Sequence, residues 1–196
     1  PIKESSLLTG ELEKTNQCYA IAKIAGIKFC EALYEDHDLD IICLMPTNVY
    51  GDKDNFDKIN GHVIPAMITK IQEAKKNNEK YVQLLGTGKP LREFIHADDL
   101  GLSIIKSLKV NSKILKKKFK KKLPIMNVGT NEEISIKELS VLIAKIIKFK
   151  GIIKFDQKSP DGTFKKKLDS KKINQIGWYP KIRLSVGLKK VIEKRL

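Results

Sequence analysis

Tyr19 and Lys23 are a pair of residues whose types and spacing could carry out chemistry. They stand four positions apart in a segment expected to be helical, so both side chains would share one helix face. A tyrosine phenol is a weak acid at neutral pH, and a neighbouring ammonium group stabilises its phenolate form. Such a pair could exchange a proton with a carbonyl oxygen while hydride moves at the carbon. The structural alternative is a packed tyrosine beside a solvated lysine.

His62 is the histidine best placed for acid–base work. It stands at the start of an expected helix, where the helix dipole disfavours the imidazolium and keeps a neutral base available. The alternative is a histidine that only caps the helix. His37 lies in an acidic stretch and is expected at the surface, whereas His96 is expected to orient a loop.

The three cysteines do not predict a metal site or a disulfide framework. Cys18, Cys30 and Cys43 are an odd number and lack CxxC spacing. Free thiols are typical of a reducing compartment, so we expect the cytoplasm.

The elements that would position these residues alternate between helix and strand. This alternation predicts an α/β fold with a largely parallel sheet, and ligands bind such sheets beyond the carboxyl ends of the strands. The capping-box pattern of Ser135 and Glu138 marks one helix start. Helices are expected over 15–34, 62–76, 98–108, 135–149, 170–176 and from 185 onward, and strands over 40–44, 81–85, 92–96, 125–128 and 152–155.

Composition excludes several classes of protein. With 41% hydrophobic and 31% charged residues among 196, the chain can bury a core, and it has no apolar run long enough to span a membrane. The net charge of +15 suggests nucleic-acid binding, yet only three of the 38 basic residues are arginine, the residue that groove readers favour. The seven lysines within 113–122 are expected to form a solvated surface loop.

The order of the motifs resembles the extended short-chain dehydrogenase/reductase superfamily. In detail it resembles the branch that epimerises and reduces GDP-4-keto-6-deoxy-mannose. The resemblance covers nearly the whole chain except 109–123. The stretches that carry it are PIKESSLLTG (1–10), YAIAKIAGIKFC (19–30), MPTNVYG (45–51), HVIPA (62–66), LGTGKPLREFIHADD (85–99), SPDGT (159–163) and LD (168–169).

This resemblance implies roles for the first group of site residues. Tyr19 would be the proton donor, and Lys23 would stabilise its phenolate and bind the nicotinamide ribose. His62 would be the acid–base residue for epimerisation and would lie near the cofactor, NADP(H). The residues lining the nicotinamide would be Pro46, Thr47, Asn48 and Val49.

The resemblance also implies substrate contacts. Arg92 would meet the diphosphate or the sugar of a GDP-sugar, a role suited to its planar fork of donors; an ion pair with Glu93 at the surface is the alternative. Asp161 would hold a substrate hydroxyl, although Pro-Asp-Gly is also an ordinary turn. Lys70 replaces a frequent arginine and Leu85 replaces a typical tryptophan, which puts one sugar or base contact in doubt.

The resemblance further predicts the domain organisation. Residues 1–50 and about 93–130 would belong to a Rossmann domain that lacks its N-terminal half, and about 51–92 and 131–196 would form a smaller α/β substrate-binding subdomain. The chain does not begin with Met, and no GxGxxG motif follows an expected strand. We therefore expect either a processed chain or the C-terminal part of a longer enzyme, inactive alone and homodimeric when complete. The alternatives are another nucleotide-sugar epimerase or dehydratase, or a non-catalytic basic module that binds nucleic acid.

Overall fold

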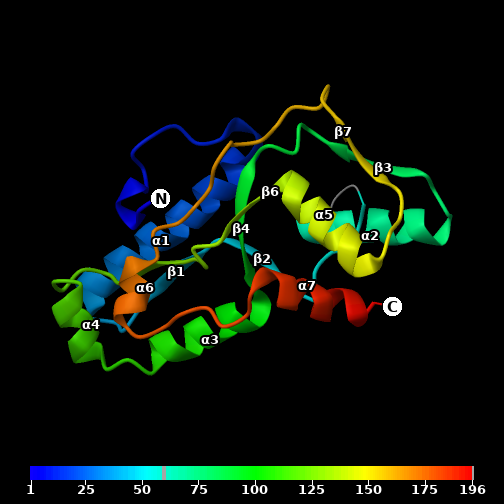
Figure 1. The fold of residues 1–196 in the computed structure, drawn as a ribbon. Helices are drawn as coiled ribbons and strands as arrows, with labels where there is room; N and C mark the ends of the chain where they lie inside the picture. The colour runs from blue at the N-terminus through cyan, green and yellow to red at the C-terminus, as the bar shows by residue number, and fades with distance from the viewer. Residues whose placement is uncertain (59–60, 196) are drawn as a thin grey trace.

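The computed structural model describes residues 1–58 and 61–195, and helices alternate with strands along the chain (Figure 1). The predicted α/β class is therefore confirmed. The α-helices are α1 (Gln17–His37), α2 (Val63–Lys76), α3 (Ala97–Leu108), α4 (Ser112–Lys118), α5 (Ile136–Ile147), α6 (Lys171–Gln175) and α7 (Leu184–Glu193). The strands are β1 (Cys43–Pro46), β2 (Asn48–Tyr50), β3 (Tyr81–Leu85), β4 (Leu91–His96), β5 (Ile125–Val128), β6 (Glu133–Ser135) and β7 (Ile152–Asp156), and two 3-10 turns, η1 (Glu4–Ser6) and η2 (Lys14–Asn16), precede α1.

The strands pair in three small groups that are mostly parallel. β1 lies beside β5, β3 lies beside β7, and β2 lies beside β4, all in parallel, whereas β4 and β6 are antiparallel. Parallel pairing places the ends of β1 and β5 at the same edge, where Pro46 stands opposite Val128. Loops that leave this edge can therefore build a site.

Two hydrophobic clusters stabilise the fold, and β4 joins them. The larger cluster packs α2, α5 and α7 against β3, with Ile68, Leu139 and Leu188 fully buried. The smaller cluster packs β5 against the α6 region through Met126 and Trp178. Successive side chains of a strand point to opposite faces, so Phe94 enters the larger cluster while its neighbour Ile95 enters the smaller one.

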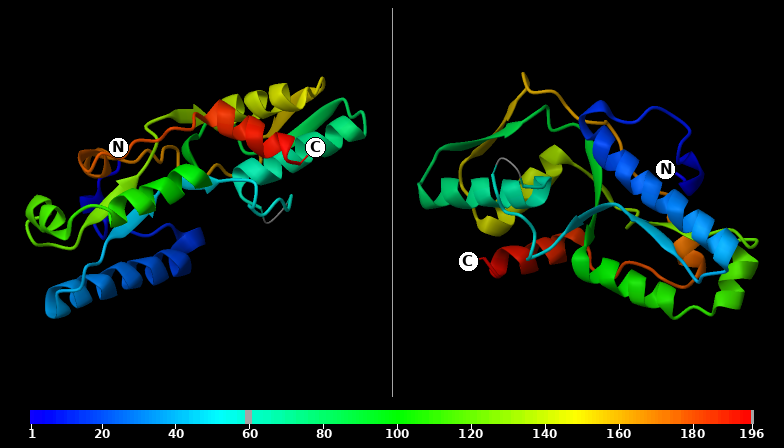
Figure 2. Two further views of the ribbon diagram at one scale, coloured as in Figure 1. Left: turned by 90° about the horizontal axis from the view of Figure 1, so that it is seen from below. Right: turned by 180° about the vertical axis from the view of Figure 1, so that it is seen from behind.

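Helix α1 stands apart from both clusters. Figure 2 shows it on one side of the strands, with α3 on the other side. Of its 21 residues, Tyr34 alone is buried, whereas Ile21 and Phe29 are 52% and 66% exposed. Its outer turns are therefore held by little packing within the described residues.

The observed elements differ from the expected ones at β1, β2, β6 and α4. The short strands β2 and β6 were not expected, and β1 begins at Cys43, three residues later than the predicted strand. The lysine-rich stretch 113–122 was expected to be a loop, and this is wrong for 113–118, which belong to the helix α4, whereas 119–122 lie outside the helices. Asn111 caps this helix by accepting a hydrogen bond from the Lys113 amide at 2.9 Å, and Leu115 anchors it in the smaller cluster.

Candidate active site

The loops after β1 and before α2 open onto a cavity of about 540 Å³, here called the tyrosine cavity. Tyr19, near the start of α1, forms one wall, and His62, which directly precedes α2, belongs to another wall. The remaining lining residues are Pro46, Thr47, Asn48, Val49, Tyr50, Gly61, Val63, Ile64, Pro65, Arg92 and Phe94. The cavity thus collects several of the predicted site residues from segments far apart in the sequence.

Tyr19 and Lys23 share one face of α1, as their spacing predicts. The Lys23 ammonium lies 5.4 Å from the centroid of the Tyr19 ring, and the Tyr19 side chain is 61% exposed. The structural alternative of a packed tyrosine is excluded by this exposure. Tyr19 lines the cavity, whereas Lys23 lies beside its ring and is not one of the lining residues.

The loop that carries Thr47 and Asn48 is fixed by the backbone of β4. The Thr47 hydroxyl and the Asn48 amide both donate to the carbonyl oxygen of Glu93, at 3.0 and 2.8 Å. The amide of Thr47 donates to the Val128 carbonyl at 3.0 Å. These bonds hold the cavity wall to two strands at once.

Glu93 is buried, which excludes the alternative of a surface ion pair with Arg92. Its side chain is 0% exposed, and one carboxylate oxygen accepts hydrogen bonds from the amides of Thr130 and Asn131, both at 2.7 Å. The other oxygen accepts from the Leu168 amide at 3.0 Å. Buried charge is tolerated when hydrogen bonds satisfy it in this way, so the Glu93 side chain ties the 130–131 loop and the segment around Leu168 to β4.

His62 precedes the first turn of α2 but does not cap it, because its side chain makes no capping hydrogen bond. The imidazole is 78% exposed, and its Nδ1 lies 2.9 Å from Oδ1 of Asp54, whose side chain is only 13% exposed. The alternative of a helix-capping histidine is therefore wrong for His62. It holds instead for His96, whose ring accepts a hydrogen bond from the Asp98 amide at 3.2 Å at the start of α3.

A pocket of about 250 Å³, here called the side pocket, adjoins the tyrosine cavity, with which it shares Gly61, Val63 and Arg92. Its lining includes Lys70, Leu85, Arg92 and Asp161, the four residues expected to contact substrate.

Arg92, predicted as a substrate contact, lines both the tyrosine cavity and the side pocket. One guanidinium nitrogen donates to the carbonyl oxygens of Leu91 and Thr163, at 2.8 and 2.6 Å. Burial lowers the pKa of Arg92 from its usual value, and the charges of Glu13 and Asp161 oppose that shift. These two hydrogen bonds therefore hold the guanidinium in place where it lines the side pocket.

Asp161 is held by the loop after β3. Its two carboxylate oxygens accept hydrogen bonds from the Thr87 amide at 2.8 Å and the Thr87 hydroxyl at 2.6 Å. These bonds lower the pKa of Asp161, with further help from Lys89 and Arg92. Gly86 is required beside it, because its φ is +78° and an added Cβ would lie 2.5 Å from Asp161 Oδ1.

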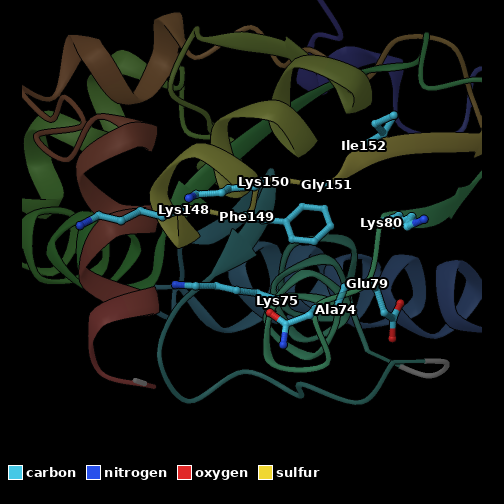
Figure 3. Close-up of a pocket in the computed structure, with 10 residues that line it drawn as sticks. Ala74, Lys75, Glu79, Lys80, Lys148, Phe149, Lys150, Gly151 and Ile152 are labelled. Atoms are coloured by element: carbon cyan, nitrogen blue, oxygen red, sulfur yellow. The ribbon is translucent and has the colours of Figure 1, made fainter.

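A larger hollow of about 590 Å³ lies away from these residues (Figure 3). It opens between the ends of α2 and α5 and the starts of β3 and β7, and Phe149 and several lysines line it. Lysines at helix C-termini complement the helix dipole, which accounts for Lys75 and Lys148 there. Because parallel sheets bind ligands at the opposite strand ends, we place the site in the tyrosine cavity and side pocket.

Two residues of the site were not found from the sequence, Asp54 and Glu93. Their partners are decided by the folded loops; Asp54 lies in none of the quoted motifs, and Glu93 lies in the 85–99 stretch but was given no site role. Within 1–58 and 61–195, no cluster of His, Cys, Asp or Glu is suited to hold a metal ion. No helix among those residues has both the length and the apolar character needed to cross a membrane.

The geometry places potential proton donors and acceptors around one cavity, next to a pocket with cationic groups. Comparison with known proteins agrees with this chemistry. The chain is 47% identical over 188 residues to a probable GDP-L-fucose synthase 1 of Oryza sativa subsp. japonica; the match covers 96% of this chain and 55% of the rice protein. The chain thus spans about half the length of that curated relative.

Two solved structures share the fold. One is a GDP-6-OMe-4-keto-L-xylo-heptose reductase from Campylobacter jejuni, with a TM-score of 0.89 and 33% identity, covering 100% of this chain and 65% of the reductase. The other is a GDP-L-fucose synthetase from Naegleria fowleri bound to NADP, with a TM-score of 0.83 and 26% identity, covering 98% and 60%.

The matched family extends across both walls of the tyrosine cavity. The model of the NAD dependent epimerase/dehydratase family matches residues 1–129, which include Tyr19, the loop after β1, His62 and Arg92. This chain belongs to the NAD dependent epimerase/dehydratase family.

Proposed function

We propose that this chain is the catalytic and substrate-binding part of a GDP-L-fucose synthase. The reaction is 3,5-epimerisation of GDP-4-keto-6-deoxy-mannose, followed by NADPH-dependent reduction of its 4-keto group to give GDP-L-fucose. The observation that carries the proposal is that Tyr19 and His62 line one cavity, which adjoins a pocket containing Lys70 and Arg92. The similarity to the rice relative supports the same substrate.

In this proposal Tyr19 protonates the oxygen at C4 during reduction. The Lys23 ammonium, placed over the Tyr19 ring at 5.4 Å, stabilises the phenolate that remains. The exposure of Tyr19 towards the cavity leaves its hydroxyl accessible to a bound ketone.

His62 serves the other half of the reaction. The protons at C3 and C5 are acidic because the enolate left by their removal delocalises onto the 4-keto oxygen. An imidazole at the cavity rim can exchange a proton with one face of the substrate carbon, and inversion needs a second acid–base group on the opposite face, which residues outside this chain would supply. Its 78% exposure keeps the ring available to a bound sugar.

The cavity fits the nicotinamide end of NADP(H). Pro46, Thr47, Asn48 and Val49 form a wall beside Tyr19 that is fixed by bonds to β4, and Lys23 would contact the ribose. When bound, the cofactor supplies hydride to C4. The NADP-bound relative from Naegleria supports this cofactor.

The side pocket would bind the rest of the GDP-sugar. Arg92 and Lys70 supply positive charge for the diphosphate, and Asp161 can accept a hydrogen bond from a sugar hydroxyl. Leu85 is 67% exposed and offers an apolar surface in the place of the typical tryptophan.

We also infer the organisation of the complete protein. Residues 1–50 and about 93–130 would belong to the Rossmann domain, and about 51–92 and 131–196 to the substrate-binding subdomain. The complete enzyme would be a homodimer in the cytoplasm. The similarity to GDP-sugar enzymes gives no support to the alternative of a nucleic-acid-binding module.

The test is to fuse the N-terminal segment of the rice relative, up to its matched region, to this chain. The fusion should oxidise NADPH with GDP-4-keto-6-deoxy-mannose and should exchange the C3 and C5 protons in heavy water. Tyr19→Phe should abolish NADPH oxidation yet spare the exchange. Unchanged NADPH oxidation in this variant would contradict the role of Tyr19 as proton donor. Reduction without C3 and C5 proton exchange in the unmutated fusion would indicate a different nucleotide-sugar enzyme.

A further inference from the structure

The loop between β2 and α2 places a carboxylate behind His62. Asp54 is largely buried, and its Oδ1 lies 2.9 Å from His62 Nδ1, whereas the imidazole itself is exposed at the cavity. The same oxygen accepts a hydrogen bond from the Asn55 amide at 2.8 Å, which fixes the direction of the carboxylate. One ring nitrogen of His62 therefore faces a carboxylate that does not line the cavity, while the ring itself does.

We propose that Asp54 is a positioning residue for His62, which holds the imidazole in the tautomer protonated at Nδ1. This inference rests on the proposed function for its catalytic meaning. An ionised carboxylate accepts hydrogen bonds and donates none, so the ring nitrogen facing it must carry the proton. In a neutral imidazole Nε2 is then the unprotonated nitrogen, free to remove a proton from bound substrate.

The surroundings of Asp54 support a role beyond folding. Its second oxygen, Oδ2, is buried and has no hydrogen-bond partner among the described residues. Leaving a buried carboxylate oxygen unsatisfied costs stability, and such exceptions are often found where function requires them. The carboxylate can balance the positive charge that appears on His62 when the ring takes up a proton.

The loop that carries Asp54 is itself anchored from the end of α7. Lys194 forms an ion pair with Asp52 at 2.7 Å, and the Arg195 guanidinium lies 3.6 Å from the centroid of the Phe56 ring. Each contact lies two residues from Asp54, one on either side. Together these two contacts fix the loop segment that presents the Asp54 carboxylate to His62.

The first test is independent of activity and uses this chain alone. Long-range ¹H–¹⁵N correlation spectra distinguish the two imidazole tautomers, and the chain has only three histidines to assign. At about pH 8.5, where an ordinary imidazole is neutral, His62 should carry its proton on Nδ1, and Asp54→Asn should shift the population towards Nε2–H. A wild-type His62 protonated mainly at Nε2 would overturn the proposal.

The second test uses the rice fusion and a matched control. Asp54→Asn should slow C3 and C5 proton exchange by at least about 10-fold, a part of the roughly 10²–10⁴-fold that acid–base catalysis contributes in total, while the KM for the GDP-sugar stays unchanged. The control is Asp98→Asn, because Asp98 lies 3.5 Å from a different histidine, His96, and is 71% exposed. It should leave the exchange rate as it is.

The two tests separate this proposal from the proposed function. An active fusion whose exchange is unaffected by Asp54→Asn would overturn the role of Asp54 and leave the proposed function standing. A wild-type fusion that neither exchanges protons nor oxidises NADPH would count against the proposed function, and the tautomer of His62 would then decide the role of Asp54 alone.

Discussion

The two walls of the tyrosine cavity are held by very different amounts of packing. The wall of His62 belongs to α2, which has six buried residues in 14, and the loop after β1 is tied to the buried Glu93 junction. The wall of Tyr19 belongs to α1, which has one buried residue in 21. The described chain therefore fixes the proposed base and substrate pocket firmly, and it leaves the proposed proton donor on a lightly packed helix.

The largest expected effect is in the wall of His62. Ile68 on α2 is 0% exposed within the larger cluster, so Ile68→Ala should remove apolar contacts and leave a cavity. We expect the free energy of unfolding to fall by about 2–5 kcal/mol. Urea denaturation of this chain followed by circular dichroism would measure it. A loss below about 1 kcal/mol would contradict the description of α2 as the firmly packed wall.

A somewhat smaller effect is expected at the junction beneath the cavity. Glu93→Gln keeps the size of the side chain but replaces one acceptor oxygen by a donor that faces backbone amides. We expect a loss of about 2–3 kcal/mol, because hydrogen bonds to charged groups are stronger than neutral ones and an unmet buried group is costly. Denaturation with Glu132→Gln as the matched exposed control would show the difference, and equal losses in both variants would contradict it.

The smallest effect is expected in the wall of Tyr19. Ile21 on α1 is 52% exposed, so Ile21→Ala in this chain should change the free energy of unfolding by about 0.5 kcal/mol or less. This variant is matched to Ile68→Ala, because the same substitution, isoleucine to alanine, is made on the helix of the other wall. A loss as large as that of Ile68→Ala would show that α1 is packed as tightly as α2, and the comparison would fail.

The elements that the sequence predicted best are those with a strong local signal. The strand β3 has the expected bounds, and the capping box of Ser135 and Glu138 is present with both of its hydrogen bonds. Such features depend on neighbouring residues, which a sequence shows directly. The α/β class follows from the same alternation of local patterns.

The missed features depend on contacts between distant residues. β2 and β6 have three residues each and are strands only because β4 lies between them. The helix α4 was hidden by its charges, since a run of lysines gives little apolar periodicity. Glu93 is separated by 37 to 75 residues from its amide partners, and Asp54 meets His62 through a folded loop. Motifs predicted Tyr19 and His62 as site residues, whereas the roles of Asp54 and Glu93 could be recognised only in the folded structure.

Because the end of α7 contacts the loop that carries Asp54, a fluorescent probe on this helix could report changes at the site. Glu193 is exposed and directly precedes Lys194 and Arg195, which contact Asp52 and Phe56 of that loop. In a variant whose own free cysteines, Cys18, Cys30 and Cys43, are replaced by serine, a small environment-sensitive dye attached through Glu193→Cys would therefore report movements of the loop. The change in dye emission as GDP-sugar is added would then measure ligand binding near His62 from a position at the surface.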